Sequence, residues 1–299
     1  MSLPFSLLPI TADGASPSWC GNGFQIGSEH CQVLQYSQNS QGWNDELTHF
    51  HEESVGDQHF IDRASREHAI DELKQHLPNE TATILEVGCS SGYFIKKLKC
   101  SFPNATVMGA DVVVEPLQKL AELWPEVPFF RFDLTHCPLP DNCVDAVVIL
   151  NVLEHIEDDA SALKHLYRIL KPGGILVIEV PSGPDLYDIY DKLMMHYRRY
   201  KLSHLCQLAK KSGFHILKRS HLGVLIFPGF WLVKQRNKRC LNESEAIQRA
   251  SVQNSIKQSG DSKLLHALMR LELRIGRKIS FPVGIRCLLT CKKSENGPN

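Results

Sequence analysis

A strand-like run followed by a glycine turn carries the clearest chemistry in this sequence. Residues 84–98 are ILEVGCSSGYFIKKL, in which a short apolar run precedes Gly88 and Gly92 and a helical pattern follows. Two glycines let the backbone approach a ligand closely, at a point where the N–H groups of a helix face outward. The turn therefore predicts a site for a nucleotide-like ligand.

Two carboxylates narrow the identity of that ligand. Asp111 ends the next apolar run, nineteen residues after Gly92, where it can accept hydrogen bonds from ribose hydroxyls. The turn is GxxxG rather than the GxGxxG of dinucleotide sites, and Glu86 lies two residues before it. A carboxylate there would repel a pyrophosphate but suits a positively charged ligand. S-adenosylmethionine, with its sulfonium and α-ammonium groups, is such a ligand.

The elements that would position these residues alternate between strand and helix. Apolar strand patterns fall at 83–87, 106–111, 127–132, 144–150 and 175–180, and helical patterns at 93–100, 115–124 and 160–170. Strands that are apolar throughout indicate a parallel sheet covered on both faces. We expect an α/β fold, a Rossmann-like doubly wound sheet of about seven strands.

Further segments flank this core. We expect a helix at 202–211, a strand at 214–218, an apolar loop at 223–233, helices at 243–257 and 262–278, and a last strand at 285–291. The expected units are a loosely ordered extension (1–45), a helical cap (46–80), a cofactor-binding core (81–220), a substrate-side helical insertion (221–280), and the last strand and tail (281–299). The cap is expected to close over the ligand.

The motifs between residues 84 and 216 together resemble the class I S-adenosylmethionine-dependent methyltransferases, particularly the type 11/23-like group that methylates small molecules. LEVGCSSG is similar to the family's glycine-rich first motif, GADVV to its ribose motif, and FDL at 132–134 to its adenine-side acidic motif. VLEHIEDD and LKPGG are similar to the segments around strands four and five. Ser90 stands where many members have a third glycine.

The resemblance implies S-adenosylmethionine as cofactor and a set of residues that bind it. These are Glu86, Gly88, Cys89, Gly92, Asp111, Val112, Asp133, Leu134 and Asn151. Asp111 would hold the ribose, Asp133 would accept a hydrogen bond from the adenine amino group, and Asn151 would reach the reacting end. From the residues alone, Glu86 could be a surface charge, Asp133 an Asx-turn residue, and Cys89 a small packing residue.

Two histidines are candidates for a catalytic base, which methyl transfer needs only if the acceptor must lose a proton. His155 follows Asn151 by four residues, at the exposed end of the fourth strand; a capping or packing role is an equal alternative. His196 lies in the segment after the fifth strand. There the resemblance to the family's HxRxY stretch favours a structural or gating role slightly.

Composition excludes several function classes. The 33 Lys and Arg balance the 33 Asp and Glu, so no overall field would attract nucleic acid, and we expect no nucleic-acid partner. The ten cysteines are scattered without CxxC pairs, and the HExxH spacing is absent, so no metal site is predicted. The first residues lack a basic n-region, so a cytoplasmic protein with reduced thiols is expected.

The expected function is methyl transfer from S-adenosylmethionine to a small acceptor. The apolar stretch 223–233 precedes a basic run of Lys234, Arg236, Lys238 and Arg239, a pairing found at lipid-like substrates and membrane surfaces. A hydrophobic or lipid-like acceptor and peripheral membrane contact are therefore hypotheses, and the alternative for these residues is a buried loop with a solvated basic edge. The alternatives are an NAD-dependent oxidoreductase on the same fold and a non-catalytic protein that binds S-adenosylmethionine.

Overall fold

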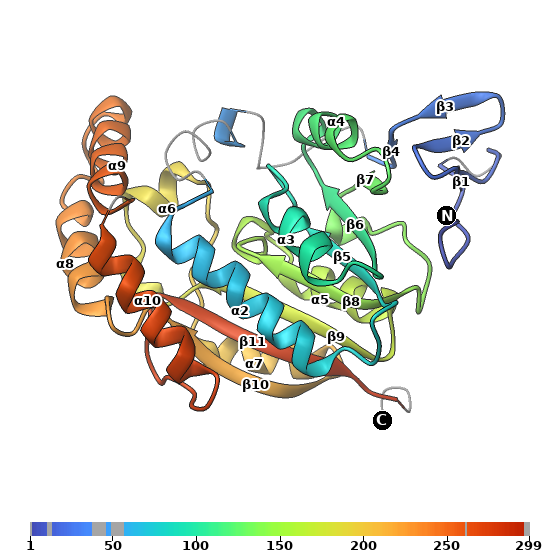
Figure 1. Ribbon diagram of the computed structural model, residues 1–299. Coiled ribbons are helices and arrows are strands. Elements are labelled where there is room, and N and C mark those ends of the chain that lie inside the picture. The colour runs from blue at the N-terminus through green and yellow to red at the C-terminus, as the bar shows by residue number, and fades with distance from the viewer. Residues whose placement is uncertain (1, 11–13, 38–45, 49–56, 261, 296–299) are drawn as a thin grey trace.

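An eight-stranded sheet forms the centre of the molecule (Figure 1). In spatial order its strands are β10 (Phe214–Leu222), β11 (Arg286–Lys293), β9 (Leu170–Pro181), β8 (Val144–Leu150), β5 (Thr83–Val87), β6 (Thr106–Asp111), β7 (Phe129–Arg131) and β4 (Val33–Gln35). This computed structural model describes residues 2–10, 14–37, 46–48, 57–260 and 262–295. The predicted Rossmann-like α/β fold is confirmed, with one more edge strand than expected.

The order of the strands reverses between β5 and β8. From β5 the chain moves outward through β6 to β7, and it then returns to the other side of β5 to form β8 and β9, all in parallel. β11 pairs antiparallel with β9 and with β10. Ligands of open α/β sheets bind in the crevice at the carboxyl ends of the strands beside such a reversal. Here that crevice lies beyond Val87 and Leu150.

Helices cover both faces of the sheet. One face carries α2 (Phe60–His76), α3 (Tyr93–Ser101) and α4 (Val114–Leu123), and the other carries α5 (Asp159–Ile169) and α7 (Leu202–Lys211). The strands are apolar throughout because their side chains alternate between these two layers: Ile84 packs with the first set of helices, and Leu85 and Val87 with the second.

The predicted cap segment contributes α2, which lies along the sheet rather than over the ligand crevice (Figure 1). Ala69, Ile70 and Leu73 join the core against the sheet, and only the first turn of the helix reaches the carboxyl edge. Residues 49–56 of the predicted cap lie outside the described residues.

The N-terminal segment contains more regular structure than the predicted loose extension. Strands β1 (Ser18–Trp19), β2 (Phe24–Ile26) and β3 (Glu29–Cys31) form a small antiparallel sheet, and β4 extends the edge of the main sheet by pairing with β7. Phe24 is fully buried against Phe130, with ring centroids 5.3 Å apart. Tertiary burial therefore orders strands that are too short to produce a sequence pattern.

The segment before the last strand is helical, as predicted. It contains α8 (Phe227–Lys238), α9 (Glu245–Gly260) and α10 (Lys263–Gly276), which lie together at one end of the molecule (Figure 1). The apolar loop expected at 223–233 is wrong, because α8 begins at Phe227 with Pro228 in its first turn, where the missing N–H costs nothing. None of the helices in the described residues has the length and apolar character needed to cross a bilayer.

The basic run that follows the apolar stretch is not one continuous basic surface. Lys234 is 4% exposed and turns inward to carboxylates, whereas Arg236 and Arg239 are exposed. The helical period separates these side chains: positions 234 and 237 of α8 face the interior, and positions 236 and 239 face solvent.

Candidate active site

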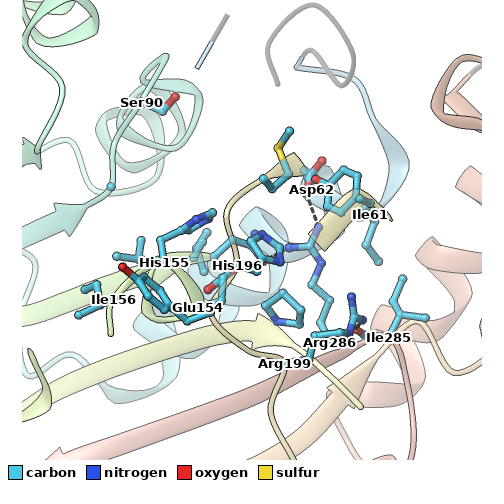
Figure 2. Close-up of a pocket in the computed structure, with 18 of the residues that line it drawn as sticks. Ile61, Asp62, Ser90, Glu154, His155, Ile156, His196, Arg199, Ile285 and Arg286 are labelled. Carbon is cyan, nitrogen blue, oxygen red and sulfur yellow. Dashed lines mark hydrogen bonds and ion pairs between the residues drawn. The ribbon is translucent and has the colours of Figure 1, made fainter. Parts of the chain in front are cut away.

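One large pocket opens at the carboxyl ends of β5 and β8. Its volume is about 990 Å³, at the upper end of the range for small-molecule sites. One end is lined by the glycine turn after β5, and the other by the segment after β8 and by side chains of α8 and α10. In Figure 2, Ser90 of the turn lies well apart from Glu154 and His196. The pocket therefore has two ends. We call the end at the glycine turn the cradle end, and the end beside Glu154 and His196 the second end.

The glycine turn is tied to the end of β6. The amides of Gly88 and Cys89 both donate to the carbonyl of Ala110, at 2.8 and 3.1 Å, and the Ser90 amide donates to Asp111 Oδ2 at 2.9 Å. Gly88 has φ +79°, and a Cβ added to it would overlap Val152. Position 88 thus requires glycine for two reasons: its φ is positive, and the Val152 side chain after β8 leaves no room for a Cβ.

Asp111 lies at the mouth of the turn. Its Oδ1 accepts from the Val113 amide at 3.1 Å, while its Oδ2 holds the Ser90 amide. Burial raises the pKa of this carboxyl, and the backbone hydrogen bonds oppose the rise. An ionised carboxylate offers about four lone-pair sites, so both oxygens retain capacity for ligand hydroxyls. The side chain is fixed in place before a ligand arrives.

Asp133 and Leu134 lie on the neighbouring wall. Oδ1 of Asp133 accepts from the Thr135 amide at 2.8 Å and from the Thr135 hydroxyl at 2.7 Å, and it caps the short 3-10 helix η1 (Leu134–His136). This is the Asx-turn alternative; Asp133 also lines the pocket, and its Oδ2 lies 4.0 Å from His136 Nδ1. The local turn and a contact to a ligand are therefore compatible.

A charged cluster connects the second end of the pocket to the sheet. Arg286 of β11 donates to Asn151 Oδ1 and forms ion pairs with Glu179 of β9 at 3.2 Å and with Asp62 of α2 at 2.8 Å. Burial raises the pKa of Glu179 to about 7, and the charge of Arg286 opposes this. Ser65 donates to the same carboxyl at 2.6 Å. Arg286 thus joins three elements beneath the pocket.

Glu154, His155 and His196 meet beside this cluster. The rings of the two histidines are 4.6 Å apart and nearly perpendicular, and one ligand atom from each of the three residues lies within 4.8 Å of the others (Figure 2). Glu154 is completely buried, and neither of its carboxyl oxygens has a hydrogen-bond partner within the described residues. Burial raises its pKa to about 8.

A buried network orients His196. Its Nδ1 lies 2.8 Å from Asp191 Oδ1, and Asp191 also pairs with Arg199 and Lys234, each at 2.9 Å. Burial would raise the pKa of Asp191, but these partners hold it well below its usual value, so Asp191 is ionised and His196 Nδ1 carries the proton. Burial lowers the pKa of His196, which leaves the ring neutral with Nε2 as an acceptor.

The segment that forms the turn and the neighbouring strands matches a known family. Residues 85–178 match the model described as "Methyltransferase domain". This stretch of about a third of the chain is thus similar to methyltransferase domains. Among curated proteins it is similar to a trans-aconitate 2-methyltransferase of Azoarcus sp., 32% identical over 42% of this chain and 49% of that protein. It is also similar to a demethylmenaquinone methyltransferase of Thermus thermophilus, 34% identical over 40% of this chain and 55% of that protein. The chain thus spans about half the length of these relatives.

Solved structures share the fold of the methyltransferase domain. The Haemonchus contortus phosphoethanolamine N-methyltransferase 2, solved in complex with S-adenosylmethionine, has a TM-score of 0.53 at 18% identity and covers 83% of this chain and 56% of that one. The [4+2]-cyclase SpnF has a TM-score of 0.50 at 20% identity and covers 78% of this chain and 82% of that one. At such identities the likeness concerns the fold alone.

The methyltransferase fold brings most of the predicted site residues into one pocket. Those that line it are Gly88, Asp111, Val112, Asp133, Leu134, Asn151, His155 and His196. Three predicted residues, Glu86, Cys89 and Gly92, are not among the lining residues. A Cβ at Gly92 would lie 2.5 Å from Leu120 of α4, so this glycine admits α4 close to the turn. The side chain of Cys89 is buried in the core, and burial raises the pKa of its thiol well above the usual value.

Glu86 is buried beneath the turn. Burial raises the pKa of its carboxyl well above the usual value, and the neighbouring charge of Asp111 raises it further. Oε2 has no hydrogen-bond partner within the described residues. The surface-charge alternative therefore does not describe Glu86, whose carboxyl lies in the interior.

Sequence reasoning missed four polar residues of the pocket region. Glu154 lies within the motif that was recognised, next to His155, and its charge in an apolar context was an available signal. Glu179, Asp191 and Arg286 belong to segments whose neighbours are defined only by the folded sheet, so no local pattern in the sequence identifies them.

Proposed function

We propose that this protein transfers the methyl group of S-adenosylmethionine to a small, apolar acceptor bound in the same pocket. The observation that carries the proposal is the joint placement of the Gly88 turn, Asp111 and Asp133 on the wall of one 990 Å³ pocket. The family match of residues 85–178 supports the same cofactor.

The cradle fits S-adenosylmethionine on structural grounds. The absence of a Cβ at Gly88 leaves room beside Val152, and Asp111 presents a pre-oriented carboxylate to a ribose. Val112 and Leu134 would flank the adenine, Asp133 would accept its amino proton, and Asn151 would lie toward the reacting end. When bound, the cofactor supplies an electrophilic methyl group on a sulfonium. Glu86 would act through the turn rather than by touching the ligand.

The chain's own contribution to methyl transfer is positioning and exclusion of water, because the sulfur leaves without needing a proton. Where the acceptor must lose a proton, His155 and His196 are the candidate bases, since both line the second end of the pocket. Neutral His196, with Nδ1 held by Asp191, presents Nε2 as the acceptor. These two histidines are the proposed catalytic residues.

The walls of the second end favour an apolar acceptor. Its apolar side chains come from α8, α10 and the turns beside them: Leu225, Ile226, Phe230, Val233, Leu265 and Leu268. The Arg286 and Lys234 charges nearby are neutralised by carboxylates, so they do not define an anion site. A lipid-like or quinone-like acceptor fits such walls, and a demethylmenaquinone methyltransferase among the relatives is in keeping with it.

The outer face of α8 supports a proposal of peripheral membrane contact. Trp231 and Leu232 are 45% and 63% exposed, and the exposed Arg236 and Arg239 follow on the same helix. Exposed apolar and basic side chains on one helix are typical of interfacial binding. Such contact would place the pocket close to a lipid-like acceptor.

A mass-spectrometric screen tests the proposed function. Purified protein is incubated with methyl-labelled S-adenosylmethionine and either a lipid extract or a panel of polar metabolites. A labelled methylated product from the lipid fraction is the expected result. Turnover of polar acceptors only, together with no co-sedimentation with anionic vesicles, would contradict the lipid-like acceptor. Cofactor binding without any product would favour a non-catalytic protein.

A further inference from the structure

The cluster at the second end of the pocket consists of Glu154, His155 and His196. Its unusual feature is a buried Glu154 carboxyl without a hydrogen-bond partner among the described residues. A carboxyl group that is completely buried ordinarily has hydrogen-bond donors around it. Both oxygens of Glu154 lack such a partner within the described residues, although the group lines the pocket. Within the described residues, a donor or cation in direct contact with the Glu154 carboxyl is therefore missing.

We propose that Glu154, His155 and His196 bind one divalent transition-metal ion, of the Zn²⁺ class, at the acceptor end of the pocket. One carboxylate and two imidazoles are a recurring ligand set for zinc and for non-haem iron, in which the remaining coordination positions stay open. The three ligand atoms lie within 4.8 Å of one another. Tetrahedral zinc ligands at about 2.0–2.2 Å from the ion are about 3.3–3.6 Å apart, so the three side chains would have to close by up to about 1.5 Å.

The surroundings of His196 support its role as a ligand. Histidines that bind metals usually donate their other ring N–H to a carboxylate, which fixes the tautomer and the orientation of the ring. Asp191 performs this function for His196 at 2.8 Å, and Arg199 and Lys234 hold Asp191 in turn. His196 Nε2 is thereby prepared to bind a cation rather than to share a proton.

The charge balance of the region also suits a dication. The carboxyl groups near the cluster are Asp62, Glu154, Glu179, Asp188 and Asp191, and the cations paired with them are Arg199, Lys234 and Arg286. When all five carboxyl groups are ionised, as a bound cation would require of Glu154, the acids exceed the bases by two. A divalent ion at Glu154 would bring the group to neutrality without moving any side chain out of its ion pair.

The proposed ion would activate the acceptor. A bound divalent cation lowers the pKa of a hydroxyl that coordinates to it. The acceptor would lose its hydroxyl proton to solvent, a new C–O bond would form from an oxygen lone pair, and the C–S bond would break with its electron pair left on sulfur. This step rests on the proposed methyl transfer, whereas metal binding itself does not. In the metal-bound form the histidines serve as ligands and not as bases.

Metal analysis of matched variants tests the site. The full-length protein is stripped with a chelator, dialysed against ZnCl₂ or CoCl₂, and freed of unbound metal before its metal content is measured by mass spectrometry. We expect about one equivalent for the unmodified protein and for His204→Ala, which removes an exposed histidine of α7. Glu154→Gln and His196→Ala should lower the affinity by at least about tenfold. Visible absorption of bound Co²⁺ should disappear in both variants.

Two controls keep the outcomes distinct. Glu154→Gln preserves the shape of the side chain, so its thermal unfolding without metal should match that of the unmodified protein. If it does not, Glu154→Asp serves as a second variant, in which metal binding should also be weakened. Zinc held by the exposed Cys20 or Cys100 would persist in every variant, and equal binding in Glu154→Gln would overturn the site. Calorimetry with S-adenosylmethionine on the same samples shows separately whether the proposed function fails.

Discussion

His196 donates its Nδ1 proton to Asp191 Oδ1 over 2.8 Å, where Asp191 lies in the short helix α6 (Ile189–Leu193) and His196 follows that helix. Asp191 can accept because Lys234 and Arg199 keep it ionised in the interior. The pair fixes one ring nitrogen of His196 and leaves the other for the pocket. A single buried carboxylate therefore determines what chemistry this histidine can perform.

Gly88→Ala is expected to destabilise the protein and to weaken binding of S-adenosylmethionine. The positive φ costs an alanine about 1–2 kcal/mol, and its Cβ would overlap Val152. Val152→Ala in the same chain should recover part of the loss, because it removes the overlap but not the backbone strain. Urea unfolding measures both effects. Equal stability of Gly88→Ala and the unmodified protein would refute the tight turn.

Ser90 has φ +40°, so this position tolerates glycine better than a branched side chain. Ser90→Gly should therefore change the free energy of unfolding by no more than about 1 kcal/mol, in the stabilising direction if strain outweighs the added chain entropy. Ser90→Val should be less stable than either. Denaturation of the three proteins in parallel tests this order, and a Val variant as stable as Gly would contradict it.

Arg286→Met should cost about 3–5 kcal/mol of unfolding free energy. Removing the guanidinium leaves the buried Glu179 and the partly buried Asp62 without their shared partner, although Asp62 keeps His59 at 3.2 Å. Arg236→Met is the matched control, since Arg236 is exposed and its replacement should change stability by no more than about 0.5 kcal/mol. Similar unfolding free energies for the two variants would show that the ion pairs of Arg286 do not hold α2 to the sheet.

Glu86 should make stability fall as pH rises. Burial raises the pKa of the Glu86 carboxyl in the folded protein, so the unfolded chain releases the carboxyl proton first, near pH 4.5. The protonated carboxyl therefore stabilises the folded state fully below pH 4.5, and this stabilisation is lost as pH rises through the folded pKa. The slope is at most about 1.4 kcal/mol per pH unit. Glu86→Gln should unfold with a weaker pH dependence above pH 4.5. An unchanged pH profile in that variant would mean that Glu86 is ionised in the folded state.

The cradle end of the pocket was predictable because its signals are local. A buried strand, the glycine turn and Asp111 lie within one strand–helix–strand unit, so their spacing in sequence fixes their spacing in the fold. Asp133 was predicted as well, although only the structure shows that its turn and a ligand contact can coexist.

The second end of the pocket was not predictable to the same extent. Arg286 reaches Asn151 across 135 positions of sequence, and Lys234 reaches Asp188 across 46, so both contacts depend on the finished sheet. The helix α8 was not predicted from the apolar run at 223–233; Pro228 lies in its first turn, where proline is compatible with a helix. The strand β4 is three residues long and exists only through its pairing with β7.

Calorimetric titration of S-adenosylmethionine and of NAD into the unmodified protein and Asp111→Asn tests the central claim most directly. We expect S-adenosylmethionine to bind and NAD not to bind. The variant should bind S-adenosylmethionine about 10- to 100-fold more weakly, because it loses a charged hydrogen bond worth about 1.5–3 kcal/mol. Binding of NAD alone, or equal affinity of Asp111→Asn for S-adenosylmethionine, would contradict a methyl-donor site in this pocket.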